Sequence, residues 1–344
     1  MRTTVGFFII MDNNTFQKPP LAIEAQLKLL GSRGLIIQDP ALAKHYLKFI
    51  SYYRFCGYAI EFEDVPLSNE KRYRSGTTFE RILDCYIFDR KLRLLVIDAI
   101  ERIEVAIRTV ISNELSIKYG AHWYLNKDLF LKRLQHDELI QTIKKETIHT
   151  THNPSQHKKR EKFIQHYFDK YNYPELPPSW MIAEVLSLGT WSIIFSNLIN
   201  REDQKIICKY FGINYVVMTS WLRSLTYLRN LCAHHSKLWS RNFTVKPLMA
   251  NHYRFPLKNN NRFTAQAAIL KIFLDIVSPD SNWVQHLYEL MKNHPQIDIA
   301  KMGFWLNWYD EGFWKISWGT GGALKDKKQQ IPTTVPNKQE TVTT

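Results

Sequence analysis

Arginine, asparagine and histidine stand close together in the sequence at Arg229, Asn230 and His234. Histidine changes its protonation state near neutral pH and can transfer protons, whereas arginine carries a fixed charge on a planar group that suits a phosphate. A lone histidine or arginine is more often a surface or packing residue. Together on one amphipathic segment of a basic chain, the three residues indicate a site that binds an anion and moves protons.

The segment that carries them, residues 219–239 (TSWLRSLTYLRNLCAHHSKLW), has the periodicity of an amphipathic helix. With Leu225 at the centre of the buried face, Asn230 and His234 lie about 40° apart on the polar face. Arg229 lies only about 40° from Leu225, beside the apolar stripe, where an unpaired charge is costly. We therefore expect Arg229 to pair with a glutamate of another helix, with a second subunit or with a phosphate.

The longest periodic segment, residues 79–119, is the expected packing partner of this helix. Arg90, Glu101, Glu104 and Arg108 lie along the border of its apolar stripe, and each alone is typical of a solvated helix charge. If the two helices pack together, we expect Glu101 or Glu104 to come within hydrogen-bonding distance of the arginine or histidine described above. The stripe itself is formed by Leu92, Val96, Ile100, Ile103, Ile107 and Ile111.

Helical periodicity marks most of the remaining chain. Asp39 followed by Pro40 is a typical helix start, and Gly120 is a typical helix end. There is no internal repeat and there are few alternating strand patterns, so the sequence predicts an all-α fold. An aromatic cluster at residues 304–318 is more typical of core closure than of a base-stacking platform. Further helices are expected at 21–30, 40–50, 52–62, 179–200, 202–211, 263–277 and 282–291.

The chain of 344 residues has a net charge of +14, which favours a polyanionic partner, with nucleic acid ahead of an anionic membrane surface. Candidate RNA contacts are the exposed-face residues Arg223 and Tyr227 and the basic run Lys158, Lys159 and Arg160. No apolar stretch approaches the roughly 20 residues that a membrane span requires. We therefore expect no membrane association.

The four cysteines lie among apolar neighbours and are not spaced as a zinc site or a disulfide framework. They are typical of reduced packing residues in a cytoplasmic protein. No histidine pair has companion ligands at zinc spacing, so we expect neither metal nor cofactor.

The chain divides into three expected regions. Residues 1–16 form a variable N-terminal extension, with Met11 as an alternative start. Residues 17–318 form one helical domain. Residues 319–344 include KDKKQQIPTTVPNKQETVTT, which lacks the apolar content to fold and is expected to be disordered.

Several long motifs follow one another along the chain. They are QKPP (17–20), ISYYRFCGY (50–58), GTTFERI (76–82), FDRKLRLLVIDAIERIEVAIR (88–108), PPSWMIAEVLSLGTWS (177–192), LRNLCAHHSKLWSR (228–241) and MGFWLNW (302–308). Together these motifs resemble the Abi-like proteins of abortive infection, which give bacteria resistance to phages. The resemblance extends over roughly residues 17–316 and implies an all-α, HEPN-like helical bundle with additional N- and C-terminal helices. HEPN denotes the higher eukaryotes and prokaryotes nucleotide-binding proteins, which include ribonucleases.

The motif of HEPN ribonucleases is an arginine, a polar residue, a few further positions and a histidine. In this chain it falls on Arg229, Asn230 and His234, with His235 as the alternative histidine. The resemblance thus implies that Arg229 and His234 are catalytic. The residues implied in support are Asn230, His235, Glu101, Glu104 and Arg108.

RNA supplies its own nucleophile, the 2′-hydroxyl, so a proton-transferring histidine and an arginine for the phosphate charge suit its cleavage without a metal. Arg229 and His234 lie about 140° apart on an ideal helix, so their action on one phosphate requires a long reach of the arginine, a local distortion of the helix or two subunits that share a site. HEPN proteins commonly pair their motif helices in this way, so a homodimer is expected.

The resulting hypothesis is a phage-defence protein that acts as a metal-independent endoribonuclease on RNA, with tRNA and mRNA as candidate substrates. Two alternatives share the same fold: a non-catalytic RNA-binding module and an interaction protein that senses a phage component.

Overall fold

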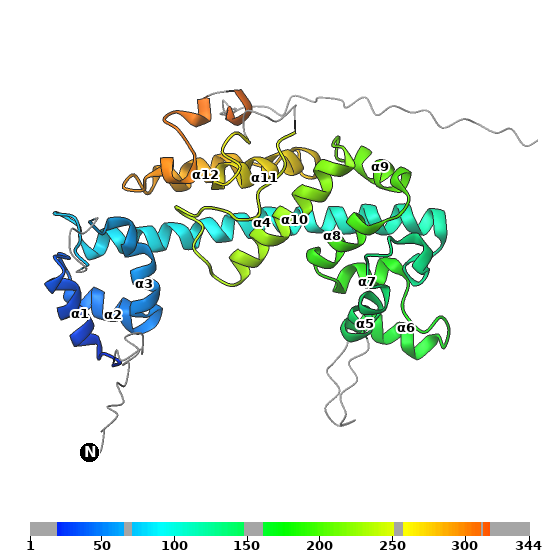
Figure 1. Cartoon of the computed structure of the whole chain (residues 1–344), viewed down its shortest axis with the longest axis horizontal. Helices are drawn as coiled ribbons and strands as arrows, with labels where there is room; N and C mark the ends of the chain where they lie inside the picture. Colours follow the sequence, from blue (N-terminus) through cyan, green and yellow to red (C-terminus); the bar gives the residue numbers. More distant parts are fainter. Residues whose placement is uncertain (1–18, 65–70, 148–160, 251–256, 311, 317–344) are drawn as a thin grey trace, which may run out of the picture.

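One long helix, α4 (Phe79–Tyr119), runs through the molecule and organises the other elements around it (Figure 1). In the computed structural model, residues 19–64, 71–147, 161–250, 257–310 and 312–316 are described. These ranges contain twelve α-helices, and their only β-pairing is in isolated bridges, which confirms the predicted all-α fold. The other helices are α1 (Ile23–Ser32), α2 (Pro40–Ile50), α3 (Tyr52–Ala59), α5 (His136–Thr147), α6 (Lys162–Lys170), α7 (Ser179–Val185), α8 (Leu188–Asn197), α9 (Arg201–Lys209), α10 (Tyr215–Ala233), α11 (Phe263–Val277) and α12 (Trp283–Lys292).

Three groups of helices surround α4. Helices α1–α3 lie at its N-terminal end and α5–α7 at its C-terminal end. Helices α11 and α12 lie along the side of α4 that faces away from these two groups (Figure 1). Helix α10 packs against the middle of α4 and also contacts α8, α9 and α11. The predicted packing of α4 against the helix that contains Leu225 is therefore confirmed.

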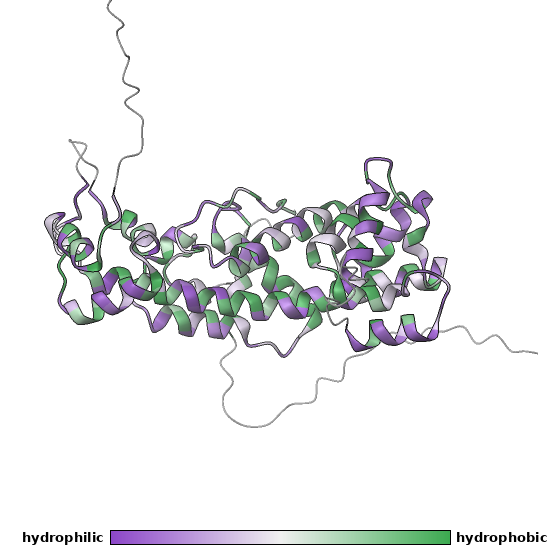
Figure 2. Cartoon of the chain, turned by 90° about the horizontal axis from the view of Figure 1, so that it is seen from below, coloured by the Kyte–Doolittle hydropathy of each residue, from purple (hydrophilic) through white to green (hydrophobic). Residues whose placement is uncertain are grey.

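Local sequence explains where α4 begins and ends. The Thr78 hydroxyl accepts a hydrogen bond from the amide of Arg81, and Gly120 follows the last turn with a φ of 90°. All six residues of the predicted apolar stripe are buried. Hydrophobic and hydrophilic residues are mixed along the helices in Figure 2. Several helices pack against α4, among them α7, α10, α11 and α12.

The sequence was misleading about two other helices. The predicted helix over residues 179–200 is two helices, because Leu186 is extended and Ser187 caps a new start at α8. The predicted helix over 219–239 ends at Ala233, and His235 has a φ of 55°. Its continuation to Trp239 is thus wrong, and the angles of an ideal helix do not apply from His235 onward.

The aromatic cluster near the C-terminus closes the core, as predicted. Phe304, Trp308 and Trp314 are buried, and their rings contact one another in pairs. The four cysteines are free; three of them are buried and Cys56 is partly buried. No helix in the described ranges combines the length and apolar character needed to cross a membrane.

Candidate functional site

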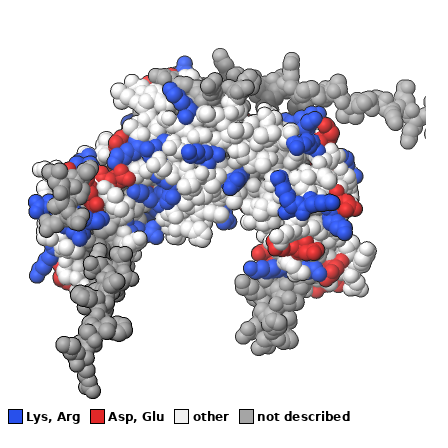
Figure 3. All heavy atoms as spheres, in the orientation of Figure 1, with Lys and Arg blue, Asp and Glu red and all other residues white. Residues whose placement is uncertain are grey.

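A cavity of about 900 Å³ lies where α2, α3, α4 and the end of α10 meet. Its wall combines an apolar part with a strongly basic part: five arginines, two glutamates and one histidine. The charged residues come from segments far apart in the sequence and are Arg54, Arg90, Arg93, Glu101, Glu104, Arg108, Arg229 and His235. In Figure 3 the visible centre of the molecule carries Lys and Arg, whereas Asp and Glu gather towards the two ends.

The end of α10 places one of the two histidines at this cavity. His234 follows the last helical residue, and its amide donates to the carbonyl of Asn230 at 3.0 Å. His235 then turns into the left-handed region, and its side chain lines the cavity with Arg229. Both histidines are exposed. The arginine and the alternative histidine of the motif therefore border the same cavity.

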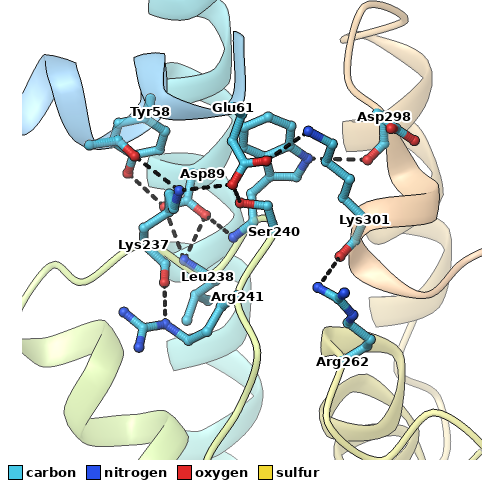
Figure 4. A network of polar contacts seen from close by, with 12 residues as sticks. Tyr58, Glu61, Asp89, Lys237, Leu238, Ser240, Arg241, Arg262, Asp298 and Lys301 are labelled. Atoms are coloured by element: carbon cyan, nitrogen blue, oxygen red, sulfur yellow. Dashed lines mark hydrogen bonds and ion pairs between the residues drawn. The ribbon is translucent and has the colours of Figure 1, made fainter. Parts of the chain in front are cut away.

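The turn after α10 is fixed by a buried carboxylate on α4, Asp89. Its oxygens accept from the amide of Leu238 at 3.0 Å, the amide of Trp239 at 2.7 Å and the hydroxyl of Tyr58 at 2.7 Å (Figure 4). Asp89 also forms a buried ion pair with Arg93, one turn further along α4. A single side chain thus joins α3, α4 and the segment that follows the two histidines.

Two arginines extend this anchoring to the cavity wall. Arg93 reaches the carbonyl of Ser236 at 3.3 Å, and Arg54 of α3 donates to the carbonyl of His235 at 2.8 Å. Burial alone would lower the pKa of Arg93, but the carboxylate of Asp89 and the hydroxyl of Tyr58 together outweigh burial and raise this pKa. Arg93 therefore remains a cation next to the cavity.

A second group of polar contacts holds the same loop on its other side. Glu61 accepts from Ser240 and from Lys301, both at 2.7 Å, and its Oε1 lies 3.5 Å from the ammonium of Lys237. The ammonium of Lys237 also donates to the carbonyl of Gly57 at 2.9 Å. Figure 4 shows the contacts of Glu61 beside those of Asp89. Residues 236–240 are therefore held from α3, from Glu61 directly after α3, and from α4.

The two glutamates predicted to support the motif line the cavity, but no ion pair between either one and Arg229 occurs among the described residues. Glu104 accepts from the amide of Leu188 at 2.9 Å and so holds the start of α8. Arg108 pairs with Glu184 of α7. Arg229 contacts the side-chain oxygen of Asn230 at 3.5 Å.

The candidate RNA contacts lie elsewhere. Arg223 is exposed and does not line the cavity, and the hydroxyl of Tyr227 accepts from Thr244 at 3.1 Å. The run of Lys158, Lys159 and Arg160 lies outside the described residues. Within the described part of the chain, no cluster of histidine, cysteine and acidic side chains is arranged to hold a metal ion.

Sequence reasoning missed the anchoring role of Asp89, Arg93 and Arg54. One signal was present, because Asp89 and Arg93 have the i,i+4 spacing of a helix ion pair and Arg93 directly follows Leu92 of the buried stripe. Arg54 gave no such signal, since only the tertiary fold brings it to the carbonyl of His235.

The profile of the Abi-like protein family matches residues 45–240, more than half of the chain. No curated protein and no solved structure matches the chain. The matched range includes every residue that lines the cavity and the whole turn fixed by Asp89. By the extent of this match, the chain belongs to the Abi-like protein family.

Proposed function

We propose that the protein acts in abortive infection, as a phage-defence endoribonuclease whose site is the cavity at the end of α10. The phage-defence role is supported by the family match. The nuclease activity is supported by one observation above the others: Arg54, Arg90 and Arg229, from three separate helices, converge with His235 on one cavity. Such convergence of like charges suits a phosphate.

In this proposal the arginines bind the scissile phosphate and stabilise the negative charge that develops on it. A histidine removes the proton of the 2′-hydroxyl or protonates the leaving oxygen. His235 is the histidine that lines the cavity, whereas His234 is the one that the motif spacing favours. Asn230 orients Arg229 through its side-chain oxygen.

The test is incubation of purified protein with RNA in the presence of a chelator, followed by analysis of the product ends. We expect cleavage that resists chelation and leaves 2′,3′-cyclic phosphates. Arg229→Ala should abolish it, and the comparison of His234→Ala with His235→Ala identifies the proton-transferring residue. Full activity of both histidine variants, or loss of activity on chelation, would refute the mechanism.

A non-catalytic RNA-binding module is the second candidate, and the exposure of both histidines favours it. A basic cavity binds phosphate whether or not a histidine transfers protons. RNA binding without cleavage, unchanged in both histidine variants and lost in Arg229→Ala, would establish this alternative.

A further inference from the structure

The cavity has an apolar half that phosphate binding does not use. Phe49, at the end of α2, is 69% exposed, and Leu94 and Val105, on α4, are 59% and 44% exposed. The ring centroids of Phe49 and His45 lie 5.0 Å apart, and the ammonium of Lys48 lies 5.4 Å from the centroid of the Phe49 ring. Apolar side chains therefore stand exposed directly beside cations.

The lining residues of α4 follow one face of the helix. They recur at intervals of three or four residues from Tyr86 to Arg108, which corresponds to roughly 33 Å of helix at 1.5 Å per residue. Exposed apolar side chains lie beside cations near both ends of this face, with Arg90 before Leu94 and Val105 before Arg108, and Glu101 and Glu104 lie between them. The result is an extended groove, long enough for several nucleotides, rather than a point site.

Resting on the proposed function, we propose that this groove binds single-stranded RNA, with unpaired bases on Phe49 and Leu94 and the backbone on Arg90 and Arg229. Proteins bind single strands with cations placed beside aromatic and apolar surface, because each unpaired base offers an apolar face beside a phosphate. In a duplex the faces of the bases are stacked inside, and the surface consists of phosphates and ribose hydroxyls. A duplex would therefore leave Phe49 and Leu94 uncovered.

A second copy of the chain fits this surface less well. In a two-fold symmetric interface the same patch occurs on both subunits, so the arginines of one copy would lie near those of the other. Arginines outnumber glutamates five to two along the groove. Arg93 and Arg108 pair with Asp89 and Glu184, which leaves Arg54, Arg90 and Arg229 against the two glutamates. Charge complementarity therefore favours a polyanion.

The experiment measures binding separately from cleavage. A fluorescent 2′-O-methyl oligoribonucleotide, which has no free 2′-hydroxyl to attack the phosphate, is titrated as a single strand and as a duplex with its complement. The proteins are the full-length chain and its Phe49→Ala, Phe49→Trp and Leu94→Ser variants. The control is Leu306→Ser, because Leu306 is 83% exposed and does not line the cavity.

We expect the single strand to bind at least about ten-fold more tightly than the duplex. Phe49→Ala and Leu94→Ser should each weaken single-strand binding by about five-fold or more, whereas Phe49→Trp, which keeps an aromatic face, and Leu306→Ser should bind as the wild type does. Unchanged thermal unfolding of these surface variants would attribute the loss to the groove.

Equal or tighter binding of the duplex would overturn the inference, as would wild-type affinity in Phe49→Ala and Leu94→Ser. A loss of affinity that follows dissociation of a dimer in light scattering would also overturn it and identify the groove as a subunit interface. Cleavage of unmodified RNA is assayed in parallel. Selective single-strand binding without cleavage would reject the nuclease proposal alone, and cleavage without such selectivity would reject this inference alone.

Discussion

Asp89 has the largest structural role of any single residue at the site. A buried carboxylate is costly unless donors surround it, and here two amides, a hydroxyl and a guanidinium do so. Two of those donors belong to the segment after α10, so the charge of Asp89 determines where that segment lies. The position of His235, three residues before Leu238, depends on this contact although Asp89 does not line the cavity.

Asp89→Asn should lower the free energy of unfolding by about 3 to 5 kcal/mol, because it leaves Arg93 buried without its carboxylate and places an amide group among donors. Urea unfolding measures the change. Asp98→Asn is the matched control: Asp98 forms the same i,i+4 pair, with Arg102, but its side chain is 60% exposed, and the expected loss is about 1 kcal/mol or less. Similar losses in the two variants would contradict the anchoring role.

Arg229→Lys tests whether the geometry of the cation matters in addition to its charge. Lysine keeps the charge but loses the planar pair of donors, so RNA cleavage should fall nearly as far as in Arg229→Ala, by roughly 100-fold or more. Initial rates of cleavage give the result. Arg223→Lys, at an exposed position outside the cavity, should retain the wild-type rate. Near-wild-type cleavage by Arg229→Lys would show that the group acts only as a point charge.

At the scale of elements, the end of α10 matters more for the site than its length. The helix ends at Ala233, and the left-handed backbone of His235 directs the chain towards Asp89. A side chain in this conformation costs about 1 to 2 kcal/mol relative to glycine. The fold accepts that cost at a residue that lines the cavity, which is the pattern expected of a functional position.

His235→Gly should therefore keep or raise the free energy of unfolding, by up to about 1 kcal/mol, because glycine adopts this backbone conformation without strain. His234→Gly, at a residue with a φ of −89°, should give no such gain. Thermal unfolding of both variants checks the comparison. If His235→Gly is at least as stable as the wild type but no longer cleaves RNA, its loss of activity is not a loss of fold. A clear destabilisation by His235→Gly would contradict the backbone argument.

The end of α4 offers a second test of this kind. Gly120 has a φ of 90° and a ψ of 168°, a region that is almost exclusive to glycine, so Gly120→Ala should cost about 1 to 3 kcal/mol. Gly57 lies within α3, where an added Cβ meets nothing within 4 Å. Gly57→Ala should thus be neutral or stabilising by about 0.5 to 1 kcal/mol. Denaturant unfolding of the two variants should give opposite signs.

Elements with local start and stop signals could be predicted from the sequence. The bounds of α2, α4 and α11 match their predicted ranges; α2 begins at the Asp39 cap, and α4 lies between the Thr78 cap and Gly120. Helix α10 lacked a stop signal, because Leu238 and Trp239 continue its apolar pattern although they belong to a loop. Their amides donate to Asp89 of α4, and the ring of Trp239 contacts Phe62 and donates to the carbonyl of Asp298. No local pattern encodes these contacts.

The candidate site, like the helices, could be predicted where local sequence patterns define it, but not where tertiary contacts do. The sequence identified Arg229 and both histidines, and it placed Glu101 and Glu104 on the helix that packs beside them. It did not identify Arg54, whose role arises from a contact with the carbonyl of a residue 181 positions away. Catalytic roles for these residues remain predictions.

At the scale of the whole molecule, Glu61 connects three parts of the chain. It follows α3, and it pairs with Ser240 and Lys237 of the loop after α10 and with Lys301 near the C-terminal end. Burial alone would raise the pKa of Glu61, but Lys301, Ser240 and Lys237 outweigh burial and lower the pKa below its ordinary value of 4.5. The charged form of Glu61 therefore stabilises the folded state.

The sign of the pH dependence follows. The pKa of Glu61 is lower in the folded than in the unfolded chain. The contribution of its carboxylate to the free energy of unfolding is therefore present above about pH 4.5 and is lost as the pH falls through the pKa of the folded state. Glu61→Gln should cost about 1 kcal/mol at neutral pH, and the difference from the wild type should shrink below pH 4.5. Unfolding of both proteins across this range measures it. A difference that grows as the pH falls would contradict the assignment.

The order in which the cavity wall appears along the chain has a consequence for biosynthesis. Arg54 and Arg90 precede Arg229 by more than half of the matched family range, and Asp89 has no loop to hold until residues 238 and 239 exist. A nascent chain that has passed only α4 through the ribosomal exit tunnel thus holds most of the residues that line the groove, but not the residues of the motif. If the proposed nuclease site is correct, a cell that makes this protein is exposed to a complete site only after translation has passed residue 239.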